Sequence, residues 1–159
     1  MPLYDNAEKL IRGALSAAAR GKKAHYVVIG YLTDAQLIAI NAYRQQRKFE
    51  PIEQEVVFRG QHLYDSRIRD DGYTVEDVLK QIARALSSEA CYVRSTKMTV
   101  LQYPTRRDDG YGNRVKDEAV LDCTNRYPKA ELFSVIPRGD FNKPPKMGGG
   151  ATVSCSPAK

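Results

Sequence analysis

The sequence contains no tryptophan, only two histidines and only three cysteines among its 159 residues. The cysteines are odd in number and widely spaced, and none has a second cysteine or a histidine at the spacing of a zinc site. We therefore expect no structural metal. Cys91 and Cys123 lie in apolar, strand-like runs and are expected to be buried thiols, whereas Cys155 lies in a polar tail.

Long apolar runs are also missing. No stretch approaches the roughly 18 apolar residues that a membrane helix requires. The segment from Leu3 to Lys9 is amphipathic and mixed in charge, so it lacks the apolar centre of a signal peptide. These absences predict a cytoplasmic protein with no membrane partner.

The composition is that of an ordinary globular protein, with 42% hydrophobic and 28% charged residues. A chain of this length fits one domain of about 100–150 residues. The net charge of +6, with a pI near 9.2, favours polyanionic partners, nucleic acid before an anionic membrane.

Hydrophobic periodicity predicts helices first and strands last. Apolar stripes at helical spacing fall in residues 5–20, with Asp5 as the cap, in 34–46, and in the segment that starts at Thr74, where Thr74 and Asp77 approximate a capping box. Strand-like runs occupy residues 25–31, 55–60, 90–94, 98–103, 115–124 and 131–137. We expect an α+β fold, with N-terminal helices packed on a C-terminal, mostly antiparallel sheet of about four strands. The domain would span residues 1–141, and residues 142–159, with two prolines and three consecutive glycines, would form a flexible tail.

Strong catalytic motifs are absent: the sequence has no Walker loop, GxSxG, HExxH or EF-hand loop. The acidic pairs Asp70-Asp71 and Asp108-Asp109 lie in turn-like segments, which favours solvated turn residues over a metal site. No cofactor is expected. The most informative segment is FRGQHLYDSR, in which Arg59, Tyr64 and Arg67 lie close to His62, and Arg69 follows two residues later. An imidazole exchanges protons near neutral pH without a metal, and arginines hold phosphates through paired donors. The alternative is a histidine that hydrogen-bonds a loop backbone.

A second basic group, interleaved with Tyr103, Tyr111 and Tyr127, lies in the strand region. Tyrosine rings stack on bases, so these residues could line one nucleic-acid-binding face; scattered solvated side chains are the alternative. The predicted nucleic-acid-binding residues are Arg59, Arg69, Arg94, Lys97, Arg106, Arg107, Arg114, Arg126 and Arg138.

Three segments together resemble the barnase, EndoU, colicin D and RelE-like ribonuclease superfamily, whose members include toxins and phage-encoded proteins. They are FRGQHLYDSR, then DGYTVEDVLKQIARAL, then the strands VLDCT and ELFSVIP, and the resemblance covers roughly residues 55–140. It implies helices on an antiparallel sheet of about four strands, and metal-independent RNA cleavage by attack of the 2′-hydroxyl on the adjacent phosphate.

The resemblance also implies roles for individual residues. His62 would be the acid or base and Arg67 would contact the phosphate, while Thr99, Tyr127 or Ser134 would orient the substrate or supply a proton. No histidine follows His62, so the second catalytic group would be Tyr, Lys, Arg or a carboxylate such as Asp122. The sequence thus predicts a toxin-type ribonuclease that acts on cellular RNA and is restrained by an acidic inhibitor. A non-catalytic nucleic-acid-binding module and a protein-interaction or regulatory domain stay open as alternatives.

Overall fold

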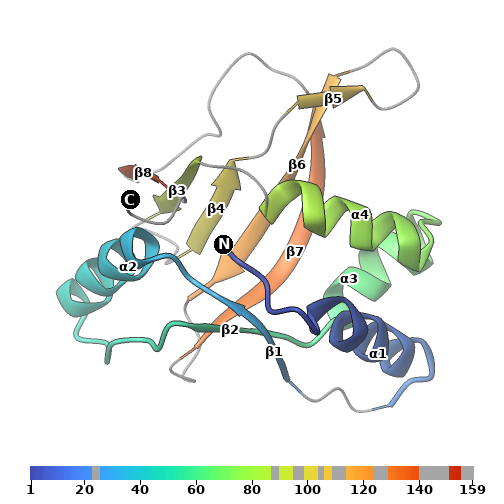
Figure 1. Cartoon of the computed structure of the whole chain (residues 1–159), viewed down its shortest axis with the longest axis horizontal. Coiled ribbons are helices and arrows are strands. Elements are labelled where there is room, and N and C mark those ends of the chain that lie inside the picture. Colours follow the sequence, from blue (N-terminus) through green and yellow to red (C-terminus); the bar gives the residue numbers. More distant parts are fainter. Residues whose placement is uncertain are drawn as a thin grey trace.

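The structure is a computed structural model of the whole chain (Figure 1). It describes backbone and side chains for residues 1–22, 26–86, 119–123 and 129–135, and the backbone alone for 90–94, 99–103, 106–108, 114–118, 136–139 and 151–154. Its fold class is α+β, as the sequence predicts. None of the described helices is long and apolar enough to cross a lipid bilayer.

The helices begin where local chemistry favours them. In α2 (Asp34–Gln46), the Thr33 side chain accepts from the backbone N–H of Gln36, and the Gln36 side chain accepts from the backbone N–H of Thr33. In α4 (Val75–Leu86), Thr74 and Asp77 exchange the same two hydrogen bonds, at 2.9 and 3.1 Å, which confirms the capping box predicted with Asp in place of Glu. By contrast, α1 (Ala7–Ala19) follows Asn6, which makes no side-chain cap, so the prediction of Asp5 as its cap was wrong.

The polar segment after residue 60, which carries His62, is helical. It forms one turn, α3 (Gln61–Leu63), and then η1 (Tyr64–Asp70), a π-helix. Leu63 is fully buried and Ile68 packs against the core. Two apolar side chains five residues apart therefore anchor a segment whose other residues are polar.

One sheet runs through the described part of the chain and contains eight strands. Its order is β1-β2-β7-β6-β4-β3-β8, and β5 pairs with β6. All pairings are antiparallel except the one between β2 and β7. The strands are β1 (Val27–Tyr31), β2 (Glu55–Phe58), β3 (Ala90–Arg94), β4 (Thr99–Tyr103), β5 (Arg106–Asp108), β6 (Arg114–Asp122), β7 (Ala130–Gly139) and β8 (Ala151–Ser154).

The sheet is larger than the expected four strands for two reasons. Both N-terminal strands join it, because β2 pairs with β7, and the short strands β5 and β8 extend it. Strand β8 lies within the segment expected to be a flexible tail and pairs with β3. The rest of that segment lies outside the described residues.

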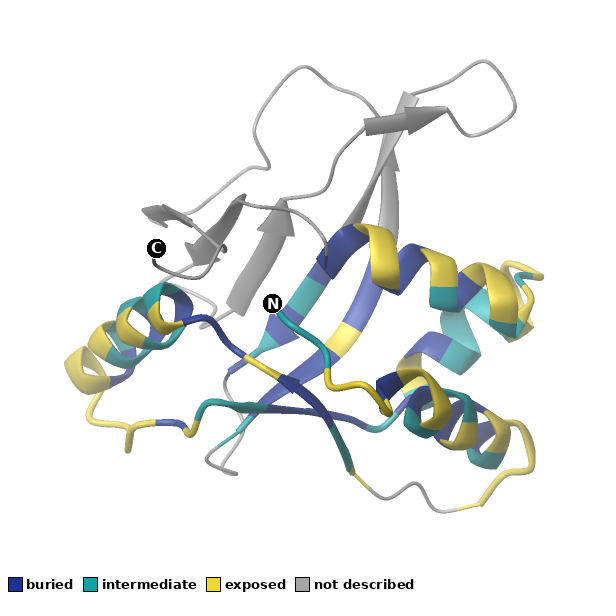
Figure 2. Ribbon diagram, in the orientation of Figure 1, coloured by how far each residue is buried: buried dark blue, intermediate teal, exposed yellow. Residues whose placement is uncertain are grey.

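A single hydrophobic core joins the helices to one face of the sheet (Figure 2). Buried side chains of α1 and α4, including Ile11, Leu15 and Ile82, pack against Phe58 and Leu121 on the strands. Ala119, Leu121 and Cys123 share the buried face, as predicted for this strand. Burial raises the pKa of the Cys123 thiol to about 12, so it is an unreactive part of the core.

Candidate functional site

The opposite face of the sheet, which we call the outer face, carries polar and aromatic side chains. Because side chains alternate along a strand, the core positions Val56 and Phe58 place Val57 on the outer face. Val57 is buried but does not belong to the core cluster. It pairs with Glu131 of β7, so Glu131 lies on the outer face as well.

A β-bulge in β7 changes this alternation. Val120 of β6 pairs with Ser134, but the next residue, Leu121, pairs with Leu132, so Phe133 has no partner in this register. Leu132 and Val135 both belong to the core, although a regular strand would point residues three apart to opposite faces. Phe133 follows the core position Leu132 and therefore faces outward, where it is 36% exposed, and the extra residue returns Val135 to the core face.

His62 lies in α3 and contacts Phe133 from a segment that follows β2. Gly60 follows β2 with φ +86°, a conformation that favours glycine, and turns the chain into α3. The His62 ring is exposed and stacks on the Phe133 ring, with centroids 4.2 Å apart and planes 13° from parallel. A tight turn, a π-helix and a bulge thus meet around one imidazole, and π-helices and bulges are both frequent at functional sites.

An ion pair lies next to this stack. The Glu131 side chain is only 6% exposed, and its carboxylate lies 3.7 Å from Nε of Arg59. The Arg59 guanidinium also lies over the Tyr26 ring, 5.4 Å from its centroid, and the Arg59 side chain remains 43% exposed. Because Glu131 precedes Phe133 by two strand positions, the Cα atoms of the two residues lie roughly 7 Å apart along β7.

Sequence reasoning did not single out Glu131. The available signal was a carboxylate at the start of the apolar run ELFSVIP, a position where a charge is unusual. Nothing local indicated that Arg59 of another strand would approach it. That approach depends on the parallel pairing of β2 with β7, which joins residues 74 positions apart.

Arg67 lies beside β7 in a supporting position. Its Nε donates to the carbonyl oxygen of Val135 at 2.9 Å, and Nη1 pairs with Asp71 at 2.6 Å; the side chain is 14% exposed. Strand β2 pairs with β7 only at Ala130 and Glu131, so it does not reach Val135. The guanidinium of Arg67 therefore donates a hydrogen bond to a carbonyl group of β7 that has no partner on β2.

The remaining expected site residues are distributed unevenly. Ser134 is 2% exposed, and its Oγ has no hydrogen-bond partner among the described residues. Arg69 is exposed and pairs with Asp65 and Asp70, and the hydrogen bond to Asp70 is the main cause that raises its pKa. Tyr127, Lys97 and Arg126 lie outside the described residues, and for Thr99, Arg94, Arg106, Arg107, Arg114 and Arg138 only the backbone is described.

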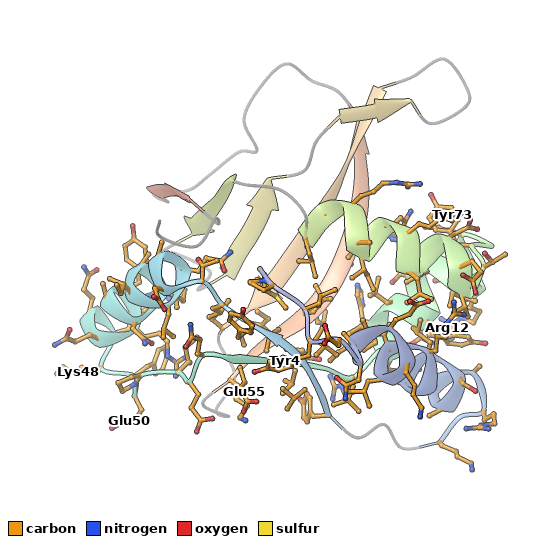
Figure 3. All side chains as sticks on the ribbon, viewed as in Figure 1. Tyr4, Arg12, Lys48, Glu50, Glu55 and Tyr73 are labelled. Carbon is orange, nitrogen blue, oxygen red and sulfur yellow. The ribbon has the colours of Figure 1, made fainter. Side chains whose placement is uncertain are left out.

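Four of the exposed aromatic residues lie on the outer face. Phe133 and Tyr26 are described above. Tyr31 pairs with Glu55, which lies two positions from Val57 on β2 and so faces the same side of the sheet. Tyr4 packs on Tyr31 with ring centroids 5.6 Å apart, and Figure 3 shows Tyr4 and Glu55 beside the β1–β2 pair, between α1 and α2. Each of these four residues is more than a third exposed, and each ring already has a neighbour: His62 on Phe133, Arg59 over Tyr26, and Tyr4 against Tyr31.

A separate hollow of about 500 Å³ lies on α2, lined by Ile38, Asn41, Ala42, Gln45, Phe49 and Pro51. None of the expected site residues lines it. Within the described residues, no three His, Cys, Asp or Glu side chains gather as a metal site.

Comparison of the chain with protein-family models, with curated protein sequences and with solved structures found no significant match.

Proposed function

We propose that this chain is a metal-independent ribonuclease of toxin type, with its reaction centre on the outer face at His62. The observation that carries the proposal is the exposed His62 ring, stacked on Phe133 and lying on the same face as the Arg59–Glu131 pair. An open imidazole, a shielded carboxylate and a guanidinium are together sufficient for proton transfer and for stabilising a charged phosphate.

The reaction needs one proton acceptor and one proton donor. Glu131 takes the proton of the ribose 2′-hydroxyl, and the 2′-oxygen attacks the adjacent phosphorus. The bond to the 5′-oxygen breaks, and protonated His62 donates a proton to that leaving oxygen. The products are a 2′,3′-cyclic phosphate and a free 5′-hydroxyl, so atoms and charge balance without a co-reactant.

Arg59 is the residue best placed to hold the phosphate. Its side chain is 43% exposed while it contacts Glu131, so part of the guanidinium faces solvent. A phosphate bound there gains paired, charge-assisted hydrogen bonds. Arg67 has a different role in this proposal, because its Nε and Nη1 already contact Val135 and Asp71; it positions the chain that carries His62.

The experiment compares cleavage of a fluorescent single-stranded RNA by the natural chain, His62→Gln and Glu131→Gln, all in excess EDTA. We expect each substitution to lower the cleavage rate at least about 100-fold, since general acid–base catalysis contributes 10²–10⁴-fold. Lys9→Gln, on the exposed side of α1, is the matched control and should cleave normally. Cleavage that EDTA abolishes, or that persists in His62→Gln, would refute the proposal.

The exposed aromatic side chains favour a second candidate, a module that binds RNA without cutting it. Tyr4, Tyr26, Tyr31 and Phe133 are each more than a third exposed on the outer face, and base stacking on aromatic rings does not require a catalytic histidine. Salt-sensitive RNA binding by the natural chain, with no cyclic phosphate formed, would select this candidate.

If the chain is a ribonuclease, its producing cell needs an inhibitor, and an acidic protein would suit the net charge of +6.

A further inference from the structure

Three basic residues occupy directly paired positions on β5, β6 and β7. They lie near the end of β7 that is far from Glu131. In the register of β5 with β6, Arg106 is opposite Lys116. In the register of β6 with β7, Lys116 is opposite Arg138. The row therefore places three positive residues at directly paired positions on three adjacent strands.

Such a row is unfavourable for the protein alone. Residues directly opposite each other in a sheet are close, and like charges there destabilise the pairing. The row itself contains no carboxylate, and each row two positions away has one, Asp108 opposite Arg114 and Glu118 opposite Ile136. A bound anion with several charges would remove the repulsion.

The distribution of charge along the chain points the same way. The residues whose side chains the structure describes contain thirteen Lys and Arg and thirteen Asp and Glu. The excess of six positive charges thus falls entirely on the other segments, which include Arg106, Lys116 and Arg138. The outer face near His62 has stacking rings but little net charge, so attraction of a polyanion must come from elsewhere on the chain.

We infer that the row Arg106–Lys116–Arg138 binds the phosphates of a single RNA strand whose scissile nucleotide lies at His62 and Phe133. This inference rests on the proposed function and specifies its substrate. Strand β7 carries both Phe133 and Arg138, which are five residues, roughly 16 Å, apart. The substrate is therefore an unpaired stretch of several nucleotides, because a dinucleotide would not reach from one position to the other.

The test measures RNA binding by fluorescence anisotropy at several salt concentrations, with His62→Gln as the background so that no RNA is cut. The triple variant Arg106→Gln, Lys116→Gln, Arg138→Gln should reduce the slope of log affinity against log salt by about 2, since each phosphate contact on a single strand contributes about 0.7. The control Lys9→Gln, Arg20→Gln, Lys80→Gln changes the net charge equally at exposed positions, two in helices and one directly after α1, and should leave the slope nearly unchanged.

Two further results separate this inference from the proposed function. If the chain binds RNA through the row but never cleaves it, the ribonuclease proposal is refuted and the row is still an RNA-binding site. If the triple variant, with His62 intact, cleaves long RNA at the natural KM, the row is not an RNA-binding site and the ribonuclease proposal is unaffected. Binding of poly-aspartate as tightly as RNA would also overturn the row as an RNA site. Lys116→Gln alone should raise the Tm at low salt, because it removes the repulsion.

Discussion

At the scale of single residues, the candidate site depends on positions where the backbone departs from regular geometry. Gly60 takes a positive φ, and a Cβ built there would lie 3.2 Å from Cε1 of Phe58. Phe133 is the unpaired residue of the bulge. The first departure sets where α3 begins, the second leaves Phe133 without a partner on β6, and the His62 ring stacks on the Phe133 ring.

Gly60→Ala should therefore destabilise the fold by about 1–2 kcal/mol, because an L side chain strains at positive φ. Gly13→Ala is the matched substitution in the middle of α1, where nothing lies within 4 Å of the new Cβ. It should stabilise the fold by about 0.5–1 kcal/mol, since alanine favours helix. Urea denaturation measures both, and equal effects at the two glycines would contradict this account of Gly60.

At the scale of elements, the sequence predicted what local chemistry determines. The apolar stripes of α1 and α4, the capping box of α4 and the buried face of β6 follow from spacing and cap residues. The π-helix and the bulge could not be predicted, because each depends on packing against segments that are far away in the sequence. The parallel contact of β2 with β7 likewise joins segments far apart in sequence, so the Arg59–Glu131 pair was not predicted.

The capping box of α4 predicts a pH dependence. Hydrogen bonds from the backbone N–H and the hydroxyl of Thr74 lower the pKa of Asp77 below its ordinary value of 3.8. A carboxyl whose pKa is lower in the folded chain stabilises the fold above its unfolded pKa, and this contribution is lost as pH falls through the folded value. Unfolding free energies of the natural chain and Asp77→Asn should therefore differ most at about pH 6 and converge toward about pH 3. A constant difference across that range would show that Asp77 acts without its charge.

At the scale of the whole molecule, two arginines join separate elements of the fold. Arg12 of α1 binds Glu8 of its own helix and Glu76 of α4, in the region that Figure 3 labels. Arg67 of η1 binds the edge of β7. The first contact is exposed and contributes little to stability, whereas the second is mostly shielded and holds the segment that carries His62 against the strand that carries Phe133.

The role of Arg67 can be separated from phosphate binding by one pair of variants. Arg67→Met keeps the aliphatic stem but removes the donors to Val135 and Asp71, so it should lower the unfolding free energy by about 2 kcal/mol. Arg69→Met, which removes only exposed ion pairs, should change stability by less than about 0.5 kcal/mol. If Arg67 only positions the chain, the salt slope of RNA binding by folded Arg67→Met equals that of the natural chain. A slope lower by about 0.7 would instead mean that Arg67 contacts a phosphate directly, as the ribonuclease resemblance implies.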